Sequence, residues 1–506
     1  MKSLLWKDYD LLSEEEYSGF TSEIDDCVFE DVKIRRVLET VYDNYSDSDE
    51  VIEVLRKIPN RDSLIYRQDF FEDVLNDKED ITKLYYKLVS LVSRYESLFA
   101  STENIKKRLH LVMYIYNFFK YIEEVNEIIN KNQYKSYIVK EISKDISIYI
   151  ERNKDLYNKV NNLYHRVSNL FDITATYLNG SPYISIDLGK KENLEDDMVE
   201  IAKMLNISLD KSARLTVRKE VNPYYLFNLV NNDEKLKNDL IDFYETYHND
   251  IIDLSKLSKE LKFYLLMKTL FESVNSKGVP YTKALVTDGK TSIKDIYDIS
   301  LTLSKINAVP NDFFIDDNEN MQFVLGVNSG GKTCYIRSLG INYVLFSSVG
   351  FMFAKEAEVF PMKYIYTHFP NEENYKVGEG RLIDEINRLN KMKKTFSSES
   401  IALLNETFSS TSEDKACTLT MELIDNCMET KGKVIFVTHQ YKIFDNLQNS
   451  NIGFYTPFVV EGENNIRTYK IKKVEKKLLS YVGDILKKHG LTKEQLLKRK
   501  KSWEIF

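Results

Sequence analysis

Apolar side chains recur at helical spacing in two long stretches before residue 270. The first series extends over about seven helical turns and comprises Ile105, Leu109, Val112, Tyr116, Phe119, Ile122, Val125 and Ile129. The second series comprises Leu236, Leu240, Tyr244, Tyr247, Ile251, Leu254, Leu257, Leu261 and Leu265. Side chains spaced in this way share one face of an α-helix. We interpret both series as helix core, and such long helices predict packed levers or coiled-coil arms.

Two shorter stretches break the helical pattern. The turn residues Gly180–Ser181–Pro182 are followed by an alternating segment from Tyr183 to Asp187, which predicts a short inserted strand. Earlier in the chain, the acidic run from Asp43 to Glu50 indicates a solvated loop.

From about Asp295 the pattern changes to short apolar strands that alternate with helices, which is typical of a parallel α/β sheet. The clearest strands are Met321–Leu325, Ser400–Leu404 and Lys433–Thr438. The sequence therefore predicts a multidomain protein, in which an all-α core and lever region precedes an α/β P-loop domain and a helical C-terminal tail. The expected ranges are 1–60 for an N-terminal helical segment, 61–290 for the helical core and lever, 291–470 for the α/β domain and 471–506 for the tail.

The turn after the first of these strands fits the phosphate-binding pattern G-x-x-x-x-G-K-[ST] without a mismatch. Glycines let the backbone curl so that successive N–H groups point at phosphate oxygens, and the next helix adds the positive end of its dipole. Lys332 is expected to reach the β- and γ-phosphates, and the Thr333 hydroxyl to bind Mg²⁺. The predicted nucleotide-binding residues are Gly326, Val327, Asn328, Ser329, Gly330, Gly331, Lys332, Thr333 and the adjacent Cys334. ATP and Mg²⁺ are the expected cofactors.

Polar residues end the two later strands. Glu406 is expected to polarise the attacking water, since this role needs a carboxylate at the carboxyl end of a strand. Asn405 stands where an aspartate normally binds magnesium. Its amide oxygen can accept from a magnesium-bound water but brings no charge, so weak Mg²⁺ retention and slow hydrolysis are expected. His439 is predicted to sense the γ-phosphate or the attacking water.

Two glycines, Gly378 and Gly380, open a helical stretch together with Arg381. The backbone N–H groups at such a start form an anion site. We expect these residues to face the γ-phosphate of a nucleotide bound by a second subunit.

Charge and cysteine content limit the possible partners and location. The net charge is −8, so any contact with nucleic acid has to be local. The segment from Lys470 to Ser502 carries twelve Lys and Arg against three acids, and it is either a solvated helical hairpin, which we favour, or a nucleic-acid contact. Four cysteines without metal spacing, a start unlike a signal peptide and apolar stretches too short for a bilayer predict a cytoplasmic protein without membrane contact.

These motifs together resemble the MutS mismatch-repair family of ABC-type ATPases. The phosphate loop is similar to the family's G-P-N-M-G-G-K-S, and Leu403–Glu406 stands where the family has L-[LM]-D-E. Further matches are Pro310–Asn311–Asp312 to P-N-[DP], Thr411–Ser412 to the T-S pair near the dimer contact, Thr438–His439 to T-H, Gly378–Glu385 to the signature segment G-x-S-T-F-x-x-E, and Ile65–Gln68 to the R-Q that opens the helical core. By this resemblance Asn311 is added to the expected nucleotide-binding residues.

The resemblance implies a homodimeric ATPase with composite ATP sites that closes helical arms on DNA in repair or recombination, with structured or branched DNA as the expected partner. Two positions depart from the family pattern, because Gly380 replaces the signature serine and Asn405 the magnesium-side aspartate. The segment before the helical core is also too short for the family's mismatch-reading domains, which implies a short form. Two alternatives are a ribosome- or RNA-associated ATPase and a structural clamp that binds ATP and scarcely hydrolyses it.

Overall fold

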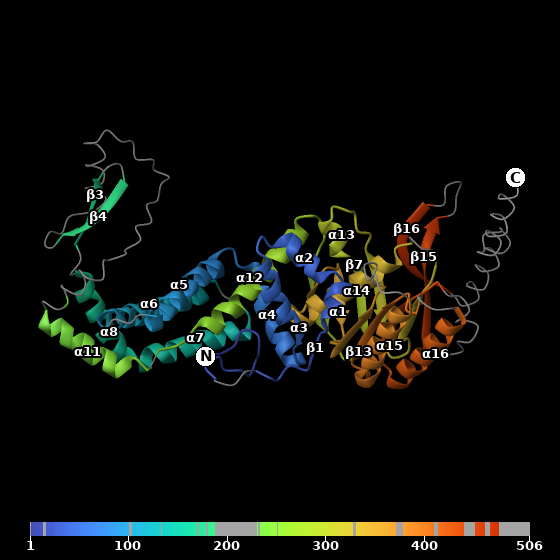
Figure 1. Ribbon diagram of the computed structural model, residues 1–506, viewed down its shortest axis with the longest axis horizontal. Coiled ribbons are helices and arrows are strands. Elements are labelled where there is room, and N and C mark those ends of the chain that lie inside the picture. Colours follow the sequence, from blue (N-terminus) through green and yellow to red (C-terminus); the bar gives the residue numbers. More distant parts are fainter. Residues whose placement is uncertain are drawn as a thin grey trace. The chain divides into compact units, whose positions relative to one another are not determined.

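The computed structural model describes residues 2–13, 17–100, 104–132, 134–169, 172–178, 181–187, 230, 233–249, 251–326, 330–370, 378–408, 413–439, 451–460 and 466–474. The chain forms two compact units (Figure 1). One contains Asp77–Lys259, and the other contains Ser3–Tyr9, Ser13–Asn76 and Glu260–Phe506. We describe them as the helical unit and the α/β unit.

The helical unit is built around one long helix. Its helices are α5 (Asp80–Ala100), α6 (Asn104–Asn132), α7 (Tyr137–Arg152), α8 (Lys154–Asn169) and α11 (Glu234–Tyr247). Helix α6 packs against each of the others, and it coincides with the first apolar series of the sequence. The predicted strand is also confirmed, since β4 (Ser181–Asp187) pairs antiparallel with β3 (Asp172–Leu178).

The second apolar series is divided between two helices, so the prediction of one continuous helix was wrong. Helix α11 ends at Tyr247, and α12 (Ser255–Asn275) begins eight residues later. The Asp253 side chain accepts a hydrogen bond from the Ser255 N–H at 2.8 Å, which satisfies a donor at the start of α12. The buried Leu254 keeps the apolar spacing across the break, which is why the periodicity concealed it.

The acidic run predicted as a loop is helical instead. From Tyr45 onward it lies in α3 (Tyr45–Arg56), and the Asn44 side chain caps the helix by accepting from the Ser46 N–H at 3.1 Å. On α12 the Lys262 Nζ lies 2.8 Å from Asp47 Oδ1 and from Glu50 Oε2. These ion pairs and a buried apolar face hold the acidic segment against its own unit.

A six-stranded sheet forms the centre of the α/β unit, in the order β12-β13-β14-β9-β15-β16. The strands are β9 (Met321–Val324), β12 (Tyr364–His368), β13 (Ser400–Asn405), β14 (Lys433–Val437), β15 (Ile452–Val460) and β16 (Ile466–Val474). All neighbouring pairs are parallel except β15 with β16. The three strands predicted from the sequence are β9, β13 and β14, and all three are confirmed.

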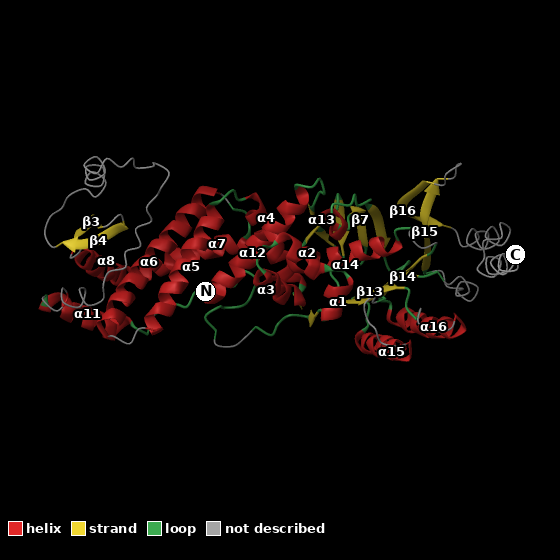
Figure 2. Ribbon diagram, turned by 45° about the horizontal axis from the view of Figure 1, so that its top comes forward, coloured by secondary structure: helices red, strands yellow, loops and turns green. Residues whose placement is uncertain are grey.

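Helices cover both faces of this sheet. On one face, α15 (Gly378–Thr395) and α16 (Glu413–Thr430) share a buried core with the strands (Figure 2). Helix α14 (Lys332–Val349) packs against β13 and β14, and its Gly340 lies between Leu403 of β13 and Val32. The first helix after the phosphate loop is thus buried between the sheet and the N-terminal segment.

The smaller strands complete the same unit. A second sheet has the order β6-β11-β7-β8 and consists of β6 (Leu285–Val286), β7 (Thr291–Ile296), β8 (Asn311–Ile315) and β11 (Glu356–Val359). Two short pairs are β1 (Ser22–Glu23) with β2 (Lys57–Ile58) and β5 (Thr282–Lys283) with β10 (Phe351–Met352). The helices α1 (Asp26–Asp31), α2 (Ile34–Val41), α4 (Arg61–Asn76) and α13 (Ile299–Leu303) also belong here.

The compact units differ from the predicted domain ranges because α4 packs against α14 within the α/β unit. Arg67 is fully buried, and its Nε donates to the Leu5 carbonyl at 2.7 Å. Gln68 donates to the carbonyls of Ala284 and Gly350 at 2.8 and 2.6 Å. The first 76 residues are therefore mostly part of the α/β unit, and the predicted boundaries at residues 60 and 290 do not separate the units.

The predicted helical tail starts too early, because residues 471–474 lie in β16. Residues 475–506 lie outside the described chain. Within the part of the chain that the structure describes, none of the helices has both the length and the apolar character that crossing a bilayer requires.

Candidate functional site

The turn between β9 and α14 requires glycine at two positions. Gly326 has φ 130° and Gly331 has φ 91°, both in the left-handed region that side chains disfavour. A Cβ on Gly326 would lie 2.9 Å from Pro457 Cδ, and one on Gly331 would lie 3.4 Å from the Tyr469 ring. The glycines of the motif thus allow close approach of β15 and β16. Val327, Asn328 and Ser329 lie outside the described residues.

Lys332 begins α14 and its ammonium lies across the turn. Its Nζ donates to the Gly326 carbonyl at 2.6 Å. Burial lowers the pKa of Lys332, and the nearby Glu406 carboxylate acts in the opposite direction. A buried ammonium beside a backbone turn favours an anionic ligand, because the ligand replaces the lost hydration.

The carboxyl end of β13 presents Asn405 and Glu406 to the same region. The Glu406 N–H donates to the Val437 carbonyl of β14 at 2.8 Å, and Glu406 has φ 49°, a left-handed conformation that costs a residue with a Cβ. Its Oε1 lies 3.6 Å from His439 Nδ1. The two residues predicted as catalytic are therefore neighbours in space.

The Asn405 side chain fits the role of a magnesium-side ligand. It is 4% exposed, and among the described residues its Oδ1 has no hydrogen-bond partner. A buried amide oxygen without a partner is costly, and a cation or its bound water would satisfy it. Thr333 lines the same cavity. Thr333 and Asn405 together fit Mg²⁺ as neutral oxygen donors.

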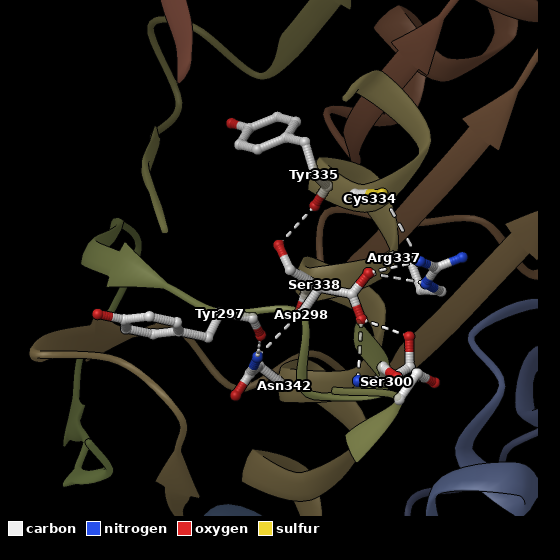
Figure 3. A network of polar contacts seen from close by, with 9 residues as sticks. Tyr297, Asp298, Ser300, Cys334, Tyr335, Arg337, Ser338 and Asn342 are labelled. Carbon is white, nitrogen blue, oxygen red and sulfur yellow. Dashed lines mark hydrogen bonds and ion pairs between the residues drawn. The ribbon is translucent and has the colours of Figure 1, made fainter. Parts of the chain in front are cut away.

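Helix α14 is anchored by buried polar contacts (Figure 3). Asp298 accepts from Arg337 Nη2 at 2.7 Å and Nε at 2.9 Å, and both side chains are at least 92% buried. Asp298 also accepts from the Ser300 N–H at 3.1 Å, which caps α13. Asn342 donates to the Tyr297 carbonyl at 3.0 Å. These contacts set the position of α14, and with it the phosphate loop, relative to the second sheet.

One cavity of about 1080 Å³ connects these groups. Its wall includes the predicted residues Gly330, Gly331, Lys332, Thr333, Cys334, Asn311, Asn405 and Glu406. It also includes residues that sequence reasoning missed, namely Ile306 to Val309, Tyr469 and a group from α1 and α2. No spacing rule connects these residues to the phosphate loop, and those from α1 and α2 lie about 300 residues from it in the chain.

Asn311 lines the cavity but its amide has structural partners. Its Oδ1 accepts from the Ile471 N–H at 2.7 Å, and its Nδ2 donates to the Tyr469 carbonyl at 3.2 Å. The side chain thus joins β8 to β16. Tyr469 itself has φ 57° and lies against Gly331.

Helix α15 begins at Gly378, as predicted. The side-chain position of Arg381 and the segment with Thr411 and Ser412 lie outside the described part. Further along α15, Glu385 accepts from the Phe408 N–H at 3.2 Å, and Arg388 forms an ion pair with the buried Asp31 of α1. Helix α15 is therefore linked both to the chain after Glu406 and to the N-terminal segment.

The parallel sheet, the glycine turn into α14 and the polar ends of β13 and β14 form one α/β domain. Residues 322–487 match the family model described as MutS domain V. A DNA mismatch repair protein MutS from Thermotoga petrophila is 24% identical over 230 residues, which are 44% of this chain and 28% of the relative. A second MutS, from Prochlorococcus marinus, is 28% identical over 167 residues, 32% and 18% of the two chains.

An endonuclease MutS2 from Thermus thermophilus is 25% identical over 154 residues, which are 29% of this chain and 21% of that protein. The chain thus covers less than a third of the length of these curated relatives. Residues 322–487 are thus similar to domain V of the MutS family, and the relatives that match this chain carry the names MutS and MutS2.

Proposed function

We propose that this chain is a MutS-related ATPase that closes as a homodimer and thereby moves helical arms around DNA. The observation that carries the proposal is the convergence of Lys332, Thr333, Asn405 and Glu406 on one cavity. These are a phosphate-binding cation, two magnesium-side oxygen donors and a general base, and phosphoryl transfer from ATP to water needs all of them.

The chemistry follows from the placement of these groups. Lys332 exchanges its contact with the Gly326 carbonyl for the β- and γ-phosphate oxygens. Glu406 accepts the proton of the attacking water as the water oxygen bonds to the γ-phosphorus and the bond to the β–γ bridging oxygen breaks. His439 senses the γ-phosphate or the attacking water, and its Nδ1 lies 3.6 Å from Glu406 Oε1. Thr333 and Asn405 would hold Mg²⁺, which would neutralise phosphate charge when bound.

The resemblance to the MutS family and the presence of a helical unit support the partners that we propose. Relatives are named as DNA mismatch repair proteins, and DNA, structured or branched, is the partner we propose here. Helices α5 to α8 and α11 supply the arms. Gly378, Gly380 and Arg381 at the start of α15 complete the nucleotide site of the second subunit. The four cysteines are all unpaired thiols, which supports a location in the reducing cytoplasm.

Asn405 favours a second candidate, a clamp that binds ATP and hydrolyses it slowly. The amide brings no negative charge to Mg²⁺, so hydrolysis would be slow. The closed dimer would then persist after ATP binds. A ribosome- or RNA-associated ATPase of the same family remains the alternative for the partner.

Steady-state ATP turnover tests these candidates. The purified chain is assayed alone and with duplex DNA, junction DNA, single-stranded RNA and ribosomes, and Glu406→Ala serves as the blank. Stimulation by one DNA structure supports the DNA-binding ATPase and identifies its substrate. Stimulation by RNA or ribosomes alone moves the protein to the other partner class.

Turnover no higher than that of the blank, with ATP still bound, supports the clamp. Asn405→Asp then separates the clamp from an inactive protein. The restored carboxylate should raise turnover and lower the Mg²⁺ concentration needed for half-maximal activity. No change in either quantity would show that Asn405 does not determine the slow hydrolysis.

A further inference from the structure

The N-terminal segment forms one wall of the cavity that contains the phosphate loop. The lining residues from α1 and α2 include Glu30, Lys33, Arg35, Arg36 and Glu39. They lie about 300 residues from Lys332 in the chain but in the same compact unit. None of them is part of the nucleotide-binding motif.

This wall is firmly packed. Val32 and Ile34, on either side of Lys33, are completely buried, and Val32 rests on Gly340 of α14. Asp31 accepts from the Thr367 hydroxyl of β12 at 2.7 Å. The turn that joins α1 to α2 is thus held between α14, which starts at the phosphate loop, and the edge of the central sheet.

Lys33 occupies this turn in a conformation that has a cost. Its φ is 60° and its ψ is 28°, in the left-handed region where glycine or asparagine is normally preferred. Such strain is retained where the surrounding structure imposes it, most often at binding sites. The two buried neighbours leave the Lys33 side chain exposed to the cavity.

Lys33 shares the cavity with the first turn of α14. Lys332, Thr333 and Cys334 line the same cavity as the exposed Lys33. The Lys33 side chain therefore borders the space that a nucleotide bound at the glycine turn would occupy.

Two other cations that line the cavity already have partners. Arg35 Nη1 lies 2.5 Å from Asp49 Oδ1, and Arg337 is paired with Asp298. Within the described chain no ion pair involves Lys33 or Arg36. These two side chains are the cations of the wall that remain available to a ligand.

We propose that Lys33, assisted by Arg36, binds the phosphate groups of the nucleotide, so that the N-terminal segment completes the site from within the same chain. This inference rests on the proposed nucleotide binding. It also explains how a site with a neutral Asn405 holds a polyanion. If Mg²⁺ is bound weakly, more of the negative charge of the nucleotide remains unbalanced. Lys33 and Arg36 on the N-terminal wall of the cavity offset that charge.

Equilibrium binding of ATPγS to the full chain, measured by calorimetry with Mg²⁺ and again with EDTA, tests this proposal. Lys33→Asn is the decisive variant, because asparagine tolerates the left-handed backbone and removes only the charge. We expect its dissociation constant to rise about ten-fold, with a larger rise in EDTA. Lys33→Arg should restore most of the affinity. Adding Arg36→Ala to Lys33→Asn should weaken binding further.

Arg35→Ala is the matched control, since it removes one positive charge from the same helix but from a side chain paired with Asp49. Unchanged affinity in Lys33→Asn, or an equal loss in Arg35→Ala, would overturn the specific contact. If the unchanged chain binds ATPγS and Lys332→Ala abolishes binding, such a result leaves the proposed function standing. Absence of binding by the unchanged chain would overturn both. Thermal unfolding of every variant checks that the fold is retained.

Discussion

Gly340 provides a quantitative test of how the N-terminal segment is seated. It lies in the middle of α14 and is buried. A Cβ at this position would lie 2.4 Å from Val32 Cγ1 and 3.2 Å from Leu403 Cδ1. Carbon atoms in contact normally lie about 3.5–4.0 Å apart. Gly340→Ala therefore forces the turn that carries Lys33 away from α14.

Two effects of this substitution have opposite signs. In a helix interior, alanine is favoured over glycine by about 1 kcal/mol. Overpacking a filled core costs about 1–3 kcal/mol, and this site lies at the upper end because Val32 is completely buried and its β-branched side chain has few alternative rotamers. We expect a net loss of about 1–2 kcal/mol in the free energy of unfolding.

A double-mutant cycle with Val32→Ala isolates the clash. Val32→Ala alone should cost about 1–3 kcal/mol, since it removes two buried methyl groups. In the double variant the nearest atom of residue 32 is its own Cβ, at 3.4 Å, which is ordinary contact. The double variant should therefore be more stable than the sum of the single losses predicts, by about 1–2 kcal/mol.

Urea unfolding followed by tryptophan fluorescence measures all four proteins. Trp6 lies in the α/β unit and packs 4.1 Å from the Arg67 guanidinium, so its signal reports this unit in a Trp503→Phe background. Strictly additive losses, or a stability gain for Gly340→Ala equal to the helix preference alone, would refute the seating of Val32 on α14. The wall carrying Lys33 would then lack its support.

Two further predictions concern buried charges. Burial raises the pKa of Glu260 to about 7 from 4.5, partly opposed by hydrogen bonds from Ser3 and the Leu4 N–H. The folded state then binds the proton more tightly, so the free energy of unfolding should fall as pH rises from about 4.5 to 7. Glu260→Gln should remove that decline. The same decline in the variant as in the unchanged chain would contradict this. Arg337→Leu leaves Asp298 buried without its partner and should cost about 3–5 kcal/mol in urea unfolding, and a loss below about 1 kcal/mol would count against it.

Local signals account for what the sequence predicted well. The phosphate loop, β9 and the start of α14 are contiguous, and their glycines and lysine are specified by backbone geometry within a few residues. Strands β13 and β14 are short apolar runs, and this local pattern was enough to recognise both of them as strands. Helix α6 was evident because its buried face repeats without interruption.

The errors occurred where a distant contact decides the outcome. The acidic run at α3 resembles a solvated loop in sequence, but Lys262 of α12 forms ion pairs with it in the structure. At the break between α11 and α12 the Asp253 side chain caps the second helix, and apolar spacing continues through the break. Sequence patterns record which side of an element is apolar, but they do not record which partner covers it.

By itself, the sequence determined that the chain carries a phosphate-loop motif followed by a glutamate and a histidine at strand ends, because each motif is local. Only the tertiary structure decided that Glu406 and His439 are neighbours, that Asn405 has a buried oxygen without a partner among the described residues, and that α1 and α2 line the same cavity. Parallel strands bring their carboxyl ends to one edge of a sheet wherever they stand in the chain. The buried residues on either side of Lys33 then hold this lysine at the cavity beside that edge.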